Sequence, residues 1–128
     1  MQSRRRKSRS VYTRKQRGGF YSEADKARLR AKFPALDPAQ QAQIVHCLSQ
    51  LKRFAPCLQT HPLRSHQFFY NLGRLQELLG ETTQPKIWWS PIEALVTAGA
   101  YVDLPGHVDR LQDLVGVAYD APLLAKGC

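Results

Sequence analysis

The chain has 128 residues, a length that fits one domain and leaves no room for two of ordinary size. Hydrophobic residues make up 43% of it, which is enough for a packed core and excludes wholesale disorder. Its 19 Lys and Arg residues against 10 Asp and Glu residues give a net charge of +9. Apolar runs are only a few residues long, so the sequence excludes a membrane span.

The excess positive charge lies at the N-terminal end. Residues 1–32 hold twelve cations and two acids, a net of +10, whereas residues 33–128 hold seven cations and eight acids, a net of −1. Within residues 1–18, only Val11 and Tyr12 are sizeable apolar side chains. They cannot offset the ~1–2 kcal/mol that ordering each backbone residue costs. We therefore predict a basic arm, residues 1–19, that is disordered in isolation, and a folded body, residues 20–122.

The first helix of the body has a clear start signal. Ser22 with Asp25 three residues later resembles a capping box, which predicts a helix that runs to about Phe33 and stops at Pro34. We expect its polar face to extend the positive charge of the arm through four side chains, Lys26, Arg28, Arg30 and Lys32.

Two longer helices follow. Asp37 and Pro38 mark the start of the second helix, and Pro56 ends or kinks it. The third helix begins after Pro62 and ends at Gly80. Both carry apolar residues at helical spacing, which predicts that they form the core. The repeating positions are Ile44, Leu48 and Leu51 in the second helix, and Phe68, Leu72 and Leu75 in the third.

The C-terminal third contains two further predicted helices. Ser90 followed by Pro91 and Glu93 is the strongest cap signal in the chain and predicts a short fourth helix. A fifth helix is expected from about Leu104 to Tyr119, followed by a loose tail at residues 123–128. Together these elements predict an all-α fold, a small single-domain bundle of four to five helices with a disordered basic N-terminal arm.

Metal and thiol chemistry is the first alternative to test. Cys47, Cys57, His61 and His66 are ligand types that suit zinc, but they do not form the two close pairs of a structural zinc site. We expect no metal site, although Cys57, His61 and His66 leave the question open. Three cysteines at irregular spacing, Cys128 being the third, indicate no disulfide framework.

Catalytic patterns are missing from the sequence. It contains no nucleophile signature and no glycine-rich phosphate loop. Asp109 and Asp113 lie four residues apart on a predicted helix that also carries Arg110, a spacing typical of a solvated face. We therefore expect neither an enzyme nor a cofactor.

The composition of the arm predicts a partner. Arg outnumbers Lys six to two in residues 1–18, and the arginine fork binds phosphate bidentately and stacks on bases. Aromatic residues among or beside the cations favour unpaired strands and RNA, and no predicted helix resembles a DNA recognition helix. The sequence thus predicts a non-enzymatic nucleic-acid-binding accessory protein that favours RNA over DNA. The expected contacts are Arg4, Arg5, Arg6, Lys7, Arg9, Tyr12, Arg14, Lys15, Arg17, Lys26, Arg28, Arg30 and Lys32.

Protein partners form the second hypothesis. Trp88 and Trp89 are adjacent, which indicates either one buried and one half-covered ring, or an exposed anchor for a partner. Residues 87–128 carry two cations and five acids, a net of −3, so we predict that this part of the body docks on a protein, as in a ribonucleoprotein assembly.

An alternative reading makes the protein an adaptor whose basic arm binds an acidic protein partner, and a third has the arm bind anionic lipids. The expected location is the cytoplasm. An organelle or the nucleus is the alternative, because the arm is rich in Arg and Ser and poor in acids.

Overall fold

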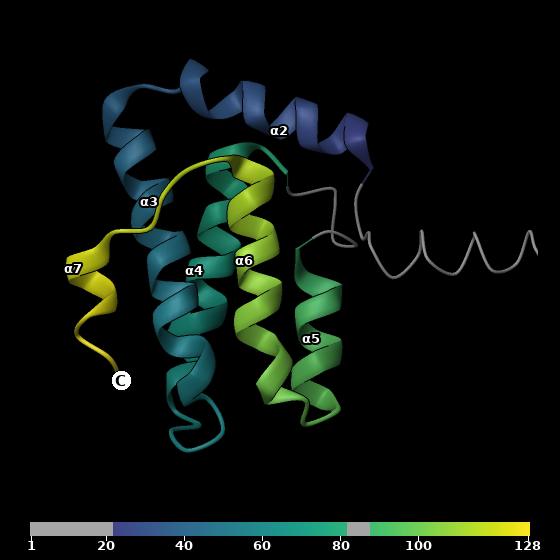
Figure 1. Ribbon diagram of the computed structural model, residues 1–128, viewed down its shortest axis with the longest axis vertical. Helices are drawn as coiled ribbons and strands as arrows, with labels where there is room; N and C mark the ends of the chain where they lie inside the picture. Colours follow the sequence, from purple (N-terminus) through teal and green to yellow (C-terminus); the bar gives the residue numbers. More distant parts are fainter. Residues whose placement is uncertain (1–21, 82–87) are drawn as a thin grey trace, which may run out of the picture.

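The computed structural model describes residues 22–81 and 88–128, and within them it is helical with no strand. This confirms the all-α character, and the described residues contain six α-helices where we expected four to five (Figure 1). In chain order the elements are α2 (Glu23–Ala35), α3 (Pro38–Phe54), the 3₁₀ turn η1 (Ala55–Cys57), α4 (Arg64–Leu79), α5 (Trp89–Thr97), the 3₁₀ turn η2 (Tyr101–Asp103), α6 (Leu104–Val115) and α7 (Ala121–Leu124).

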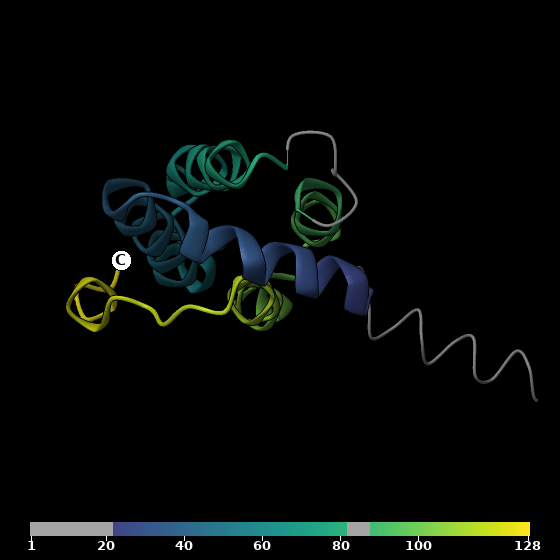
Figure 2. The ribbon, with the colours of Figure 1, turned by 90° about the horizontal axis from the view of Figure 1, so that it is seen from above.

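Four helices stand side by side, and a fifth closes one end. Figure 1 shows α3, α4, α5 and α6 as the upright members, and the view from above shows α2 crossing their ends (Figure 2). The short helix α7 lies on the outer side of α3. The core between the upright helices is apolar and fully buried, and its largest members are Trp88, Phe54, Phe68, Ile44, Leu48 and Leu72.

The first two helices begin where their caps predict. Ser22 and Asp25 form a complete capping box, and so do Asp37 and Gln40. Helix α2 ends later than expected, since Pro34 lies within it and the helix runs on to Ala35. A proline removes only its own N–H from the backbone ladder, so the last turn can still close around it.

The start of α5 differs from the prediction. The helix begins at Trp89, Trp88 occupies the cap position, and no side chain caps the helix, so Ser90 lies in the first turn. Trp88 and Ile92 are both fully buried and lie four residues apart on one face. Packing of that face therefore sets the first turn, against the local preference of Ser90 for a cap.

The C-terminal region is more ordered than predicted. Helix α6 ends at Val115, because Gly116 takes the left-handed conformation (φ 83°) that terminates helices, and the expected extension to Tyr119 is wrong. Asp120 then caps α7 by accepting a hydrogen bond from the Leu123 N–H. Residues 123 and 124, which we expected in the loose tail, are thus the end of a helix that packs on α3, and residues 125–128 follow it outside any helix.

A disulfide also anchors this end of the chain. Cys57 of η1 is bonded to Cys128, which corrects the expectation that the cysteines are unpaired. The two residues are 71 positions apart in the sequence, so their spacing carries no signal, and only the fold brings them together. Cys47 is the remaining free thiol; it is buried, and burial raises its pKa to about 11.

Candidate nucleic-acid interface

The predicted interface has two parts, and the structure describes one of them. The arm residues lie outside the described ranges, and they are Arg4, Arg5, Arg6, Lys7, Arg9, Tyr12, Arg14, Lys15 and Arg17. The other part consists of the four cations of α2, all of which are described.

Two of the α2 cations converge on Glu81, which follows α4 and is only 2% exposed. Arg28 donates from Nη2 to Oε1 over 2.8 Å, and Lys32 donates from Nζ to Oε2 over 2.7 Å. Lys32 also donates to the backbone carbonyl of Leu79, in the last turn of α4, over 2.8 Å. Cations near a helix C-terminus interact favourably with the helix dipole. Arg28 and Lys32 therefore fasten α2 to the C-terminal end of α4.

The carboxylates in this contact are held in their ionised form by the cations that bind them. Burial on its own would raise the pKa of Glu81, but hydrogen bonds from Arg28 and Lys32 outweigh burial and hold the pKa below its ordinary value. The pKa of Asp25 is lowered as well, first by the backbone N–H of Ser22 and then by Arg28. Both carboxylates are thus ionised at neutral pH and match the charge of the cations beside them.

The other two α2 cations bind the end of α6. Arg30 donates from Nη2 to the backbone carbonyl of Asp113 over 2.7 Å and to its carboxylate over 3.0 Å. Lys26 Nζ lies 3.2 Å from the same carboxylate. Gly116 leaves room for this contact, because a Cβ there would lie 3.2 Å from Arg30 Nε. All four α2 cations are therefore engaged within the body, while their side chains remain 30–46% exposed. That they extend the positive surface of the arm stays a prediction.

The two tryptophans occupy different environments. Trp88 is fully buried, whereas Trp89 is half-buried with its ring centroid 5.0 Å from that of Phe69. This confirms the interpretation of one buried and one half-covered ring. A fully buried indole cannot contact a partner, so the predicted docking role can fall to Trp89 only.

The acids of the C-terminal region are mostly used within the chain. Asp109 accepts hydrogen bonds from Lys52 Nζ and from the Tyr119 hydroxyl, each over 2.8 Å. Asp113 binds α2, and Asp120 caps α7. Three of the five acids behind the predicted docking surface thus hold helices together.

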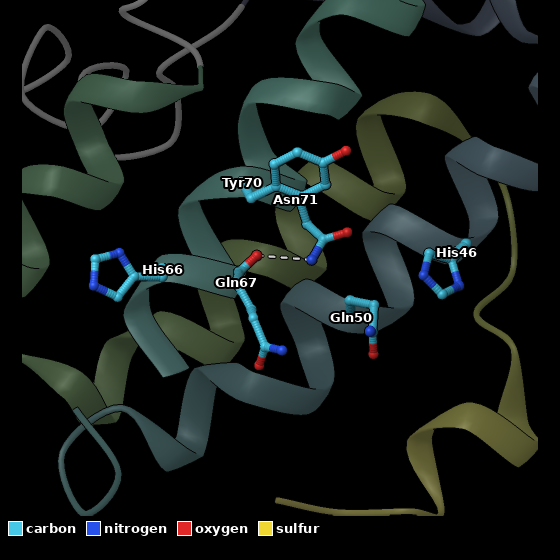
Figure 3. A pocket seen from close by; sticks show the side chains of 6 residues that line it. All are labelled: His46, Gln50, His66, Gln67, Tyr70 and Asn71. Carbon is cyan, nitrogen blue, oxygen red and sulfur yellow. Dashed lines mark hydrogen bonds between the residues drawn. The ribbon is translucent and has the colours of Figure 1, made fainter. Parts of the chain in front are cut away.

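A polar groove lies between α3 and α4, on the outer face of the helix pair (Figure 3). It measures about 520 Å³. Figure 3 shows His46 and His66 at opposite sides of the groove, with the amide side chains between them. We call it the α3–α4 groove, and its lining consists of His46, Gln50, His66, Gln67, Tyr70 and Asn71.

Helical periodicity and two arginines arrange the lining. His46 and Gln50 lie four residues apart on α3, so they share one face, as Gln67 and Asn71 do on α4. The Gln50 Oε1 atom accepts from Arg53 Nη1 over 3.0 Å, and the Gln67 Oε1 atom accepts from Arg64 Nη1 over 2.8 Å. Each arginine therefore fixes one amide and leaves the Nε2 atom of that amide to donate to a ligand.

The sequence contains a signal for this groove that motif searches miss. Residues 38–80 hold a single acid, Glu77. Within this range, His46 and Gln50 lie four residues apart, as do Gln67 and Asn71, so amides and an imidazole recur at helical spacing. His66, a candidate zinc ligand on its sequence alone, lies at one side of the groove. Cys57 offers no thiolate because it is disulfide-bonded, and among the described residues no three His, Cys, Asp or Glu side chains gather to hold a metal ion.

Comparisons with known proteins identify no relative. No protein family, curated protein or solved structure matches this chain. Within residues 22–81 and 88–128, no helix is long and apolar enough to cross a membrane.

Proposed function

We propose that this protein is a non-enzymatic nucleic-acid-binding accessory protein that prefers RNA to DNA. The observation that carries the proposal is the distribution of charge. Residues 1–18 hold eight cations and no acid, while the rest of the chain holds eleven cations and ten acids. An arginine-rich segment of this kind suits phosphate binding, because each guanidinium can contact two phosphate oxygens and stack on a base.

The proposed interface leaves out the four cations of α2. Each of them already bonds to a carboxylate of the body, so binding phosphate would require it to exchange one charged partner for another. The supporting surface in the body is the helix pair α3 and α4, since acids are scarce there and phosphate is not repelled.

A protein partner for the body is the second part of the proposal. Among the described residues, Leu63, Tyr70 and Val102 are the large hydrophobic side chains that are exposed, and Leu63 and Val102 are 83% and 86% exposed. Leu63 precedes α4 and Val102 precedes α6, so both lie at the end of the bundle opposite α2. We propose this end as the docking surface, in preference to the tryptophans.

Deletion of residues 1–18 tests the function. We expect the full chain to bind a single-stranded RNA with a log–log salt slope near −6 to −7, as for about eight neutralised phosphates, and the deleted chain to lose that binding. Fluorescence anisotropy of a labelled RNA measures both. The matched control is Lys26→Gln with Arg30→Gln, which removes two cations of α2 and should leave the affinity nearly unchanged.

The competing adaptor function makes a different prediction. If the arm binds an acidic protein, partners recovered with the full chain should persist after nuclease treatment. Full affinity for RNA after deletion of residues 1–18 would also refute the proposed function, because the body would then hold the binding site.

A further inference from the structure

We propose that the α3–α4 groove binds an unpaired nucleobase of a nucleic-acid strand, which stacks on Tyr70 and hydrogen-bonds to the amides of the groove. This inference rests on the proposed function and assigns a second, base-contacting site to it. The arm alone explains affinity for phosphate, which paired and unpaired strands share. The groove supplies chemistry that only an exposed base can satisfy.

The charge of the lining defines the class of ligand. None of the six lining residues is Asp, Glu, Lys or Arg, so the lining carries no counter-charge for an anion. Its two imidazoles lie at opposite sides of the groove, and among the described residues no three metal-ligating side chains gather (Figure 3). It offers neutral donors and acceptors beside an aromatic ring, which is the combination that recognises a planar heterocycle with an uncharged polar edge. Its volume of about 520 Å³ lies in the range of small-molecule sites.

Tyr70 provides the stacking surface. Its side chain is 69% exposed, although large aromatic residues are mostly buried in domains of this size. Figure 3 shows the ring above the amides of the groove, where a base lying on it would present its edge to them. Stacking of this kind tolerates any base, because every base has a π face.

Asn71 provides a preorganised acceptor. The residue is only 6% exposed, and its Nδ2 atom donates to the Gln67 carbonyl over 2.7 Å, which fixes the orientation of the amide. Among the described residues, none donates to its Oδ1 atom, which points toward α3 in Figure 3. A base amino group is a donor that fits this oxygen, and the Nε2 atoms of Gln50 and Gln67 complement the acceptors of a base.

The rim of the groove suits the backbone on either side of a bound base. Arg53 and Arg64, which fix Gln50 and Gln67, lie at this edge, and Arg74 lies further along the pair, where it donates to Gln43 over 2.8 Å. Three guanidinium groups thus border a neutral floor. Arg53 also donates to the Gly127 carbonyl, Arg64 to the Cys128 carbonyl and Arg74 to Glu77, so a phosphate beside the groove would share or displace these partners.

The experiment compares two labelled strands of equal charge, a single-stranded RNA and the same strand with its bases removed. We expect the wild-type protein to bind the strand with bases about 5- to 100-fold more tightly, which corresponds to the stacking of one base. Tyr70→Ala should remove most of that difference and leave only what stacking on the arm contributes, and Tyr70→Trp should restore it. Glu23→Gln, at an exposed position of α2 outside the groove, is the control and should leave the preference for bases unchanged.

The outcomes distinguish a failure of the proposed base site from a failure of the proposed nucleic-acid-binding function. If deletion of residues 1–18 abolishes binding but Tyr70→Ala keeps the full preference for bases, the function stands and the base site is wrong. If the wild-type protein binds neither strand, both proposals fall. Adenosine monophosphate should bind far more weakly than the strand; equal affinity would overturn the assignment of a strand ligand. Because Tyr70 is exposed, its variants should retain the helical circular dichroism of the wild type.

Discussion

Helix α2 and the α3–α4 pair differ in how many of their polar side chains are left to bind a partner. Helix α2 has the highest density of cations in the described chain, yet all four bind Asp25, Glu81, Asp113 or the carbonyls at the ends of α4 and α6. The outer face of α3 and α4 carries fewer charges but leaves Tyr70 exposed and an amide oxygen of Asn71 open to a ligand.

The difference shows that a cation in a sequence can serve either of two purposes: it can stabilise the fold, or it can stay available to bind a partner. A helix laid across the C-terminal ends of other helices meets exposed carbonyls and negative dipole ends, which cations stabilise. Helix α2 contributes only Leu29 to the fully buried core, with Phe33 packed partly against it, and its four cations add polar contacts to the ends of α4 and α6. The α3–α4 pair is attached by its apolar core and does not need its polar face for stability.

Core truncations give the largest expected contrast between the two regions. Leu72→Ala, in the middle of α4, should cost about 3–5 kcal/mol of unfolding free energy, because Leu72 is fully buried and its neighbours cannot collapse onto the cavity. Leu29→Ala should cost less, about 2–3 kcal/mol, because α2 can settle toward the bundle. Urea unfolding followed by circular dichroism measures both. An equal or larger loss for Leu29 would mean that α2 does not settle toward the bundle when the Leu29 side chain is removed.

We expect the disulfide to contribute about as much to the free energy of unfolding as the core residue Leu72 does. Replacing both partners, Cys57→Ser with Cys128→Ser, should cost up to about 4 kcal/mol, since the bond closes a loop with a sequence separation of 71. Adding a reductant to the wild type should lower stability to the same level, and Cys47→Ala should leave that response intact.

Equal stability of oxidised and reduced protein would contradict this assignment. The redox state of Cys57 in cells also bears on location, because disulfides are rare in the cytosol, where we expect the protein.

The ion pairs of α2 should give the smallest effects, and unequal ones. Glu81→Gln should cost about 1–3 kcal/mol because it removes the buried carboxylate that Lys32 binds and one of the two carboxylates that Arg28 binds, the other being Asp25. Asp113→Asn should cost less than about 1 kcal/mol because that side chain is 54% exposed. If the order is reversed, α2 is held mainly at α6 and not at α4.

The pH dependence sharpens the same test. The folded pKa of Glu81 lies below its unfolded value, so its contribution is present above about pH 4.5 and is lost as the pH falls through the folded pKa. Unfolding free energies measured from pH 6 to 3 should therefore fall less steeply in Glu81→Gln than in the wild type. Parallel curves would show that Glu81 titrates normally.

Local signals in the sequence determined the helices. The capping boxes of Ser22 and Asp37 fix the first turns of α2 and α3, and Gly80 ends α4, because caps and left-handed glycines act within a few residues. The apolar periodicity of residues 38–79 also predicts correctly which face is buried. The charge asymmetry that motivates the proposed function is likewise a property of the sequence alone.

Only the tertiary structure decided how distant residues are used. The pairing of Arg28 with Glu81 spans 53 positions, and that of Arg30 with Asp113 spans 83, so no local pattern distinguishes these cations from free ones. The same holds for the Cys57–Cys128 bond and for the α3–α4 groove, whose lining comes from two helices. Caps and periodicity depend on neighbouring residues, whereas ion pairs, disulfides and grooves depend on how whole helices pack.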